Sequence, residues 1–239
     1  MPQPSTSIAP STKTIVIESL DRLRQAALIF IVGSVIGFIG GVIALALVFH
    51  LFVGGFPAFE THQIALTAVA ISLAVIALAA LLAIIAVYGY LVPSAKGFAS
   101  WRPTEFSTPS TLISVGYVWG LIIFIIGLVI IGIGLSMAAH RGPGGASLIL
   151  AGVAIVIVGG ILGLIGRVGL VIMFFKLKDV FNSSTFLVVA ILEIIGLIVS
   201  LIPYAMAVAG VLGLVEWILV YTETDSIRSR IETGAIQIQ

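Results

Sequence analysis

The chain has 239 residues, of which 60% are hydrophobic and 9% are charged, and its mean hydropathy is +1.29. Because soluble domains carry about a quarter charged residues, this composition excludes a water-soluble globular protein and indicates one embedded in a bilayer. The absence of cysteine excludes disulfides, thiolate metal sites, iron–sulfur clusters and a cysteine nucleophile. Together with a single asparagine, Asn182, it is also in keeping with a thermophilic source.

The N-terminal region divides into a tail and a helix. Residues 1–12 are rich in Ser, Thr and Pro, and we predict that they form a mobile tail. From residue 13 to 25, apolar residues recur at helical spacing with charged residues on the other faces, which predicts an amphipathic helix. This helix either lies at the cytoplasmic surface or continues the first span outside the lipid. The apolar block that follows is too long for a signal peptide, so we expect it to be retained.

The apolar blocks predict a transmembrane domain at 26–221. Four blocks, 26–53, 64–92, 112–138 and 146–175, each exceed the ~20 residues that cross a bilayer. The last block would be roughly 55 Å long as one helix, so we divide it near Pro203 into spans at 185–201 and 204–221. The predicted fold is therefore an all-α, polytopic membrane bundle of about six helices, with a cytoplasmic tail at 222–239.

Basic residues predict the orientation, because Lys and Arg in short loops favour the cytoplasm. Six spans and a cytoplasmic N-terminus place nine of them inside: Lys13, Arg22, Arg24, Lys96, Arg102, Lys176, Lys178, Arg228 and Arg230. Only Arg141 lies outside and Arg167 lies within a span, whereas five spans would give seven against three. We therefore predict that both termini are cytoplasmic and that the location is the cell membrane.

Two features of the predicted inner side follow from this topology. The loop at 93–111 is the longest, and we expect its Phe98, Trp101 and Phe106 to anchor in the membrane interface. Asn182 begins a glycosylation sequon, but the topology places it inside, where no glycan would be added.

Three ionisable residues, Arg167, Glu193 and Glu216, lie within predicted spans. A charge facing lipid is costly, so we expect all three to face the bundle interior and to find partners. Arg167 and Glu193 lie at the same depth, roughly 12 Å from the inner ends of their spans, which predicts a salt bridge between the fourth and fifth spans. Glu216 lies one turn shallower, near enough to share the guanidinium or to stay protonated.

This charge cluster has two interpretations. It is either an internal clamp that fixes helix order or a proton relay or ion-coupling site. Ion-pair networks are more often architectural, which favours the clamp, but a clamp does not require the additional carboxyl of Glu216.

Small residues at intervals of four predict close helix packing. Gly33, Gly37 and Gly41 form such a seam in the first span, and Gly159 and Gly163 form another in the fourth. We interpret both as ordinary packing between helices rather than as a dedicated oligomer interface.

The remaining motifs nominate no cofactor. His50, His62 and His140 map to the outer side, with Glu60 beside His62, but their spacing matches no metal motif, and we predict neither a metal nor a haem. No P-loop, dinucleotide fingerprint or catalytic elbow is present. The scattered basic residues are typical of contacts with lipid headgroups rather than with nucleic acid.

Two stretches carry a resemblance. The segments at 18–41 (ESLDRLRQAALIFIVGSVIGFIGG) and 166–186 (GRVGLVIMFFKLKDVFNSSTF), followed by the closing helical pair, resemble an uncharacterised family of archaeal multi-pass membrane proteins. The resemblance is one of pattern and covers most of the chain. It implies an archaeal cell membrane and transfers no functional residue.

Three hypotheses about function follow. The short loops, the glycine seams and the lack of catalytic motifs favour a non-catalytic accessory subunit of a larger membrane complex, respiratory or otherwise energy-transducing, with other membrane subunits or further copies of itself as partners. The alternative is a small transporter or channel that uses Arg167, Glu193 and Glu216. The third hypothesis is an enzyme that acts on lipid, although no arrangement of residues indicates an active site.

Overall fold

The computed structural model describes residues 11–53, 71, 74–75, 77–139, 144–202 and 205–238, in which every regular element is a helix. The elements are α1 (Thr12–Val53), η1 (Ala86–Leu91), α3 (Val92–Trp101), α4 (Pro103–Ile113), η2 (Ser114–Trp119), α5 (Gly120–Ala139), α6 (Gly145–Phe181), α7 (Ser184–Ser200) and α8 (Met206–Glu232). The segments η1 and η2 are π-helical, and residues 77–85 form a helix that runs directly into η1. The predicted all-α helical bundle is therefore confirmed.

Four helical stretches are long and apolar enough to cross a membrane: Thr12–Ile43, Ala77–Trp101, Pro103–Ala138 and Gly145–Phe181. α7 is apolar but has only 17 residues. α7 ends at Ser200 and α8 begins at Met206, so the last apolar block is divided into two helices, while Pro203 itself lies outside the described residues. The protein is thus membrane-embedded, and six spans with both termini inside stay predictions.

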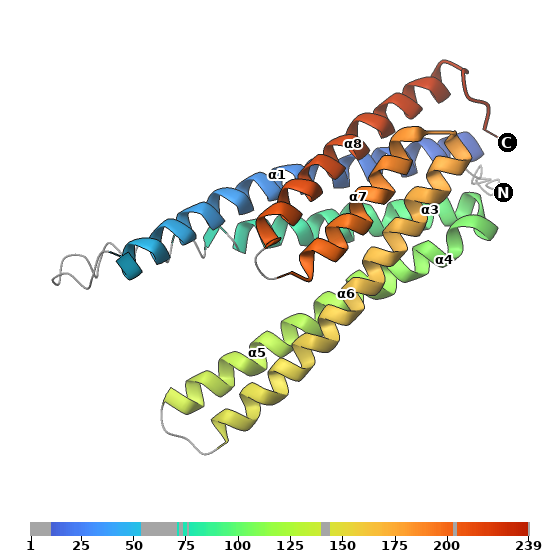
Figure 1. Cartoon of the computed structure of the whole chain (residues 1–239). Coiled ribbons are helices and arrows are strands. Elements are labelled where there is room, and N and C mark those ends of the chain that lie inside the picture. Colours follow the sequence, from blue (N-terminus) through green and yellow to red (C-terminus); the bar gives the residue numbers. More distant parts are fainter. Residues whose placement is uncertain are drawn as a thin grey trace, which may run out of the picture.

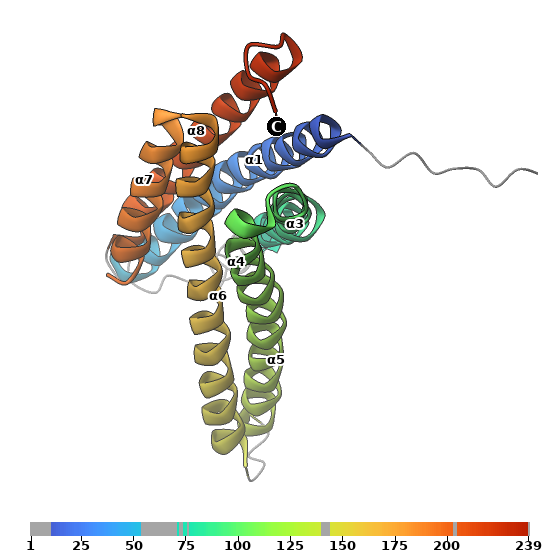
Figure 2. The same ribbon diagram turned by 90° about the vertical axis from the view of Figure 1, so that its right-hand side faces the viewer.

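The helices share one packed end and separate toward the other (Figure 1). α1, α7 and α8 lie together, while α5 and the first half of α6 form a long hairpin that points away from them (Figures 1 and 2). α5 packs along α6, and the only other described element that it contacts closely is η2. The start of α1 and the end of α8 both lie at the packed end, so the described chain begins and finishes on the same side of the bundle.

α1 is one continuous helix from Thr12 to Val53, so the predicted amphipathic segment at 13–25 continues the first span rather than forming a separate surface helix. In the segment at 13–25, the apolar residues Val16, Leu20 and Leu23 are at most 1% exposed. These side chains pack into the protein core, where each contributes about 1.5–3 kcal/mol of apolar burial.

The segment at 93–111 is helical, and its prediction as a loop with interfacial aromatic anchors is wrong. α3 and α4 meet at Arg102, which adopts a non-helical conformation (φ −129°, ψ 80°) because the residue before proline disfavours the α region. Pro103 then occupies the first turn of α4, where it loses no hydrogen bond. Phe98 and Phe106 are 0% and 1% exposed and pack against each other with ring centroids 5.5 Å apart, so burial in the core has outweighed interfacial anchoring.

The α5–α6 hairpin is held by glycines at intervals of seven in both helices. The residues in contact are Gly120, Gly127 and Gly134 on α5 with Gly159, Gly152 and Gly145 on α6. A Cβ atom on Gly127 would lie 2.9 Å from the carbonyl oxygen of Gly152, and one on Gly134 would lie 2.9 Å from that of Gly145. The two backbones are therefore in direct contact, which only glycine permits.

The seams predicted from intervals of four have smaller effects. Cβ atoms on Gly33 and Gly37 would lie at an ordinary contact distance of 3.6 Å from side chains of the helix at 77–85. On Gly41 and Gly163 an added Cβ would meet no atom within 4 Å. Gly159 does lie against α5, but as a member of the seven-residue repeat.

The turn between α6 and α7 uses the residues of the predicted sequon. Asn182 ends α6 in the left-handed conformation (φ 50°), which asparagine tolerates better than most residues. Ser183 caps α7 by accepting a hydrogen bond from the amide of Phe186 at 3.2 Å, and its hydroxyl donates to Glu223 of α8 at 2.7 Å. This turn therefore fixes α6, α7 and α8 at the packed end.

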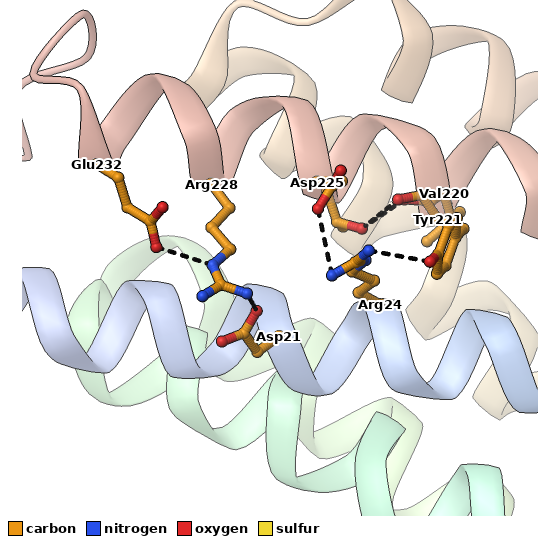
Figure 3. Close-up of polar contacts among 8 residues, drawn as sticks. Asp21, Arg24, Val220, Tyr221, Asp225, Arg228 and Glu232 are labelled. Atoms are coloured by element: carbon orange, nitrogen blue, oxygen red, sulfur yellow. Dashed lines mark hydrogen bonds and ion pairs between the residues drawn. The ribbon is translucent and has the colours of Figure 1, made fainter.

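A set of ion pairs joins α1 to α8 at the packed end, and we call it the α1–α8 latch (Figure 3). Arg228 donates to Asp21 at 2.8 Å and to Glu232 at 2.9 Å, and Arg24 pairs with Asp225 at 3.2 Å. The hydrogen bond with Glu232 and the charge of Asp21 raise the pKa of Arg228. Residues 222–239 are predicted as a tail, but α8 continues through the first part of this segment to Glu232. This part of α8 contacts α1 through the ion pairs of the latch.

Candidate functional site

Arg167 of α6 and Glu193 of α7 form a two-pronged ion pair. The guanidinium donates through Nε to Oε1 at 2.5 Å and through Nη2 to Oε2 at 3.0 Å. The salt bridge expected from the equal depth of these residues is therefore present. Nη1 of Arg167 also lies 3.4 Å from the hydroxyl of Ser200, near the end of α7. The Glu193 side chain is 5% exposed and that of Arg167 is 28% exposed, so the carboxylate is buried while the arginine is partly exposed.

Gly196 gives the guanidinium its space. It lies one turn beyond Glu193 on the same face of α7, and a Cβ atom there would be 3.5 Å from Nη2 of Arg167. A side chain larger than alanine at this position would collide with the guanidinium and disturb its fork geometry.

Glu216 of α8 is the third member of the cluster, as the sequence predicts. It is 2% exposed, its carboxyl shares a hydrogen bond with that of Glu193, and it also interacts electrostatically with Arg167. One of its carboxyl oxygens, Oε1, is buried and has no hydrogen-bond partner among the described residues. A buried polar atom without a partner costs free energy, so it requires an explanation such as a bound water, a bound ion or a functional role.

The three ionisable residues line a cavity of about 400 Å³, which lies within the range of small-molecule sites. Residues from eight helical segments line this cavity. The described wall residues are Phe30 of α1, Ala80, Ala83 and Ile84 of the helix at 77–85, Val87 of η1, Tyr117 of η2, Leu121 of α5, Arg167 and Leu170 of α6, Glu193 of α7, and Gly213, Glu216 and Trp217 of α8. The charge cluster therefore lies in the wall of a mostly apolar cavity.

Aromatic rings form part of this wall. Phe30 and Trp217 stack with their centroids 4.3 Å apart and their planes at 20°, and Trp217 also meets Phe174 edge-on at 6.4 Å. Trp217 directly follows Glu216, so α8 presents a carboxyl and an indole to the same cavity.

Both π-helical segments border the cavity, through Val87 of η1 and Tyr117 of η2. The Tyr88 hydroxyl of η1 donates to the carbonyl of Val118 in η2 at 3.0 Å, which links the two segments directly. π-helical turns occur frequently at functional sites, because they shift the helical register and free backbone carbonyls. Sequence reasoning missed Tyr117 and these turns.

The histidines do not extend the site. His62, His140 and Glu60 lie outside the described residues, and only the backbone of His50 in α1 is described. Within the described part of the chain, no group of three His, Cys, Asp or Glu residues could hold a metal ion.

The fold and the cluster define a class of protein: a membrane-embedded α-helical bundle with a cavity between its helices that is lined in part by ionisable residues. The chain belongs to the family described as "Protein of unknown function (DUF973)", whose sequence model matches residues 16–239. Comparison with curated proteins and with solved structures gives no match. Membership of an uncharacterised family is thus confirmed, and an archaeal source stays a prediction.

Proposed function

We propose that the protein is a small proton-coupled transporter of the cell membrane and that Arg167, Glu193 and Glu216 are its coupling site. One observation carries the proposal: Glu216 lines an open cavity, and its buried Oε1 has no hydrogen-bond partner in the described part of the chain. A purely structural clamp between α6 and α7 is already complete with Arg167 and Glu193.

The balance of charge supports a role in proton exchange. The cluster contains one guanidinium and two carboxyls, so full ionisation would leave a net negative charge in an apolar region. Such a charge is expensive unless it is neutralised by a proton or by a bound cation. Arg167 donates to both oxygens of Glu193, so Glu216 is the carboxyl of the cluster that would gain and lose a proton. A transporter needs a group that changes its protonation as the cavity fills and empties.

The proposal is tested in proteoliposomes that enclose a pH-sensitive dye. An inward proton gradient is applied while potassium and valinomycin clamp the membrane potential. We expect proton entry well above that of protein-free vesicles, and we expect Glu216→Gln to reduce it to the protein-free rate. Glu193→Gln should also impair entry, because it releases Arg167 to pair with Glu216.

Glu18→Gln is the matched control, since Glu18 is an exposed carboxyl at the packed end of α1. This variant should leave the proton flux unchanged. All variants must be monodisperse in detergent before reconstitution. A wild-type flux equal to that of protein-free vesicles, or an unaltered flux in both Glu193→Gln and Glu216→Gln, would reject the proposed coupling site.

An accessory subunit is the second candidate, and the α5–α6 hairpin favours it. The hairpin points away from the other helices, and Ile126, Val129 and Ile157 on it are 48%, 55% and 57% exposed. Exposed apolar side chains contact lipid or another membrane protein. Purification from native membranes in mild detergent would then recover partner subunits in fixed stoichiometry, and recovery of a lone protein with intrinsic proton flux would exclude this function.

A further inference from the structure

We propose that the cavity binds a lipophilic organic cation: a small molecule with a positive charge and an aromatic or aliphatic body. The inference rests on the proposed function and names the substrate class of the same site. It follows from the buried Oε1 of Glu216, which has no hydrogen-bond partner among the described residues, and from the side chains that surround this carboxyl.

The charge of the ligand is set by the cluster. Arg167 is the only basic side chain among the described residues that line the cavity, and both of its shortest hydrogen bonds go to Glu193. An anion entering the cavity would have to compete with Glu193 for the guanidinium and would meet Glu216. A cation would instead meet the carboxyl of Glu216, which lines the cavity and whose buried Oε1 has no hydrogen-bond partner among the described residues.

The body of the ligand is set by the walls. Phe30, Tyr117 and Trp217 present aromatic side chains, and the other uncharged residues of the wall are Ala, Ile, Val, Leu and Gly. The faces of aromatic rings attract cations, with indole the strongest, and the aliphatic side chains favour an apolar body. A small hydrated inorganic ion gains little from such walls, since it would lose its water without receiving enough oxygen ligands.

Binding exchanges a proton for the cation. In the empty cavity, Glu216 carries the proton on its carboxyl. When the cation enters, the O–H bond breaks, the proton passes to water, and the carboxylate pairs with the cation. Among the described residues, the titratable groups that face Glu216 are Arg167 from α6, Glu193 from α7 and Tyr117 from η2, while the cavity-lining residues of α1 and of the helix at 77–85 carry no ionisable group. Binding should therefore weaken as pH falls, because protons and cations compete for one carboxylate.

Tetraphenylphosphonium and tetraphenylborate test this inference, because they share a shape and differ in the sign of their charge. Calorimetric titration of the full chain in detergent, with empty micelles subtracted, should show saturable binding of tetraphenylphosphonium and none of tetraphenylborate. Titrations in two buffers of different ionisation enthalpy should show release of about one proton per bound cation. Equal binding of the two ions, or no saturable binding of the cation, would overturn the inference without any variant.

Variants locate the site. Glu216→Gln should weaken tetraphenylphosphonium binding by at least about 30-fold and abolish proton release, because the desolvated charge pair is lost. Trp217→Leu should weaken binding by about 3- to 30-fold. The matched controls are Glu18→Gln and Trp119→Leu, whose side chains are exposed, and both should bind the cation as the wild type does. Unchanged affinity in folded Glu216→Gln would overturn the inference.

The two proposals fail separately. Glu216-dependent proton entry without preference for the cation rejects the ligand class and keeps the transporter. Glu216-dependent cation binding without proton entry, in vesicles tested both without and with tetraphenylphosphonium, keeps the ligand class and rejects the transporter.

Discussion

The packed end of the bundle and the α5–α6 hairpin are both made of apolar helices, but their helices are held together differently. At the packed end, large side chains such as Phe98, Phe106 and Phe174 are fully buried, and the α1–α8 latch adds ion pairs. In the hairpin, two backbones touch through glycines and the larger side chains point outward. A membrane protein can therefore pack like a soluble core where several helices meet and by backbone contact where only two do. The cavity lies between these two regions.

The largest expected effect is at this boundary. Arg167→Leu should lower the free energy of unfolding by about 3–5 kcal/mol, because it leaves the buried carboxylate of Glu193 unpaired. Chemical or thermal unfolding in detergent, followed by circular dichroism, measures the change. The double variant Arg167→Leu/Glu193→Leu removes both charges and should recover most of the loss. A double variant that is no more stable than the single one would contradict this explanation, because the loss of stability could not then come from an unpaired Glu193 carboxylate.

Backbone contact in the hairpin predicts the next effect. Gly127→Ile should destabilise the protein by about 1–3 kcal/mol, since its Cβ atom would lie 2.8 Å from the backbone nitrogen of Val156 and the helices must separate. Gly132→Ile is the matched control, because a Cβ atom there meets nothing within 4 Å. Unfolding curves of the two variants compare directly, and equal destabilisation would contradict backbone contact as the basis of the hairpin.

Loss of the cap at the turn between α6 and α7 should have a smaller effect. Ser183→Ala removes the hydrogen bond to the Phe186 amide and the bond to Glu223, and should cost about 1 kcal/mol. The adjacent Ser184 is exposed, so Ser184→Ala should be close to neutral. Amide hydrogen exchange should show faster opening of the first turn of α7 only in Ser183→Ala.

The smallest effect is expected at the surface of the packed end. Asp21→Asn weakens the α1–α8 latch and should cost about 0.5 kcal/mol, because both partners are about one-third exposed. Salt screens such pairs, so the difference from the wild type should disappear at 1 M sodium chloride. Asp179→Asn, which affects only a pair between neighbours in α6, should show no comparable change. If the loss of stability in Asp21→Asn persisted at high salt, Asp21 would stabilise the protein by something other than its charge.

Much of this architecture can be predicted from composition and charge. Long apolar blocks predict the helices, and the depth of Arg167 and Glu193 predicts their ion pair, because helical rise converts position into depth. Proline near position 203 predicts the division of the last block. These inferences work because each depends on one helix or on a simple comparison of two.

Features that depend on several helices at once escaped prediction. Phe98 and Phe106 look like interfacial anchors until α3 and α4 fold back and bury them. The glycines were read at intervals of four, although the repeat of seven through Gly120, Gly127 and Gly134 is visible in the sequence. The cavity could not be predicted, because it forms where helices separate. The π-helical turns at Tyr88 and Tyr117 leave no local pattern.

The seven-residue repeat in the hairpin restricts how relatives of this protein can vary in length. A single residue inserted into α5 turns every later position by about 100°, which would rotate Gly127 and Gly134 away from α6. Insertion of seven residues, or two complete turns, keeps the glycines on one line. Within the glycine repeat, the hairpin can thus lengthen or shorten without loss of register in steps of about 10 Å, taken in both helices together.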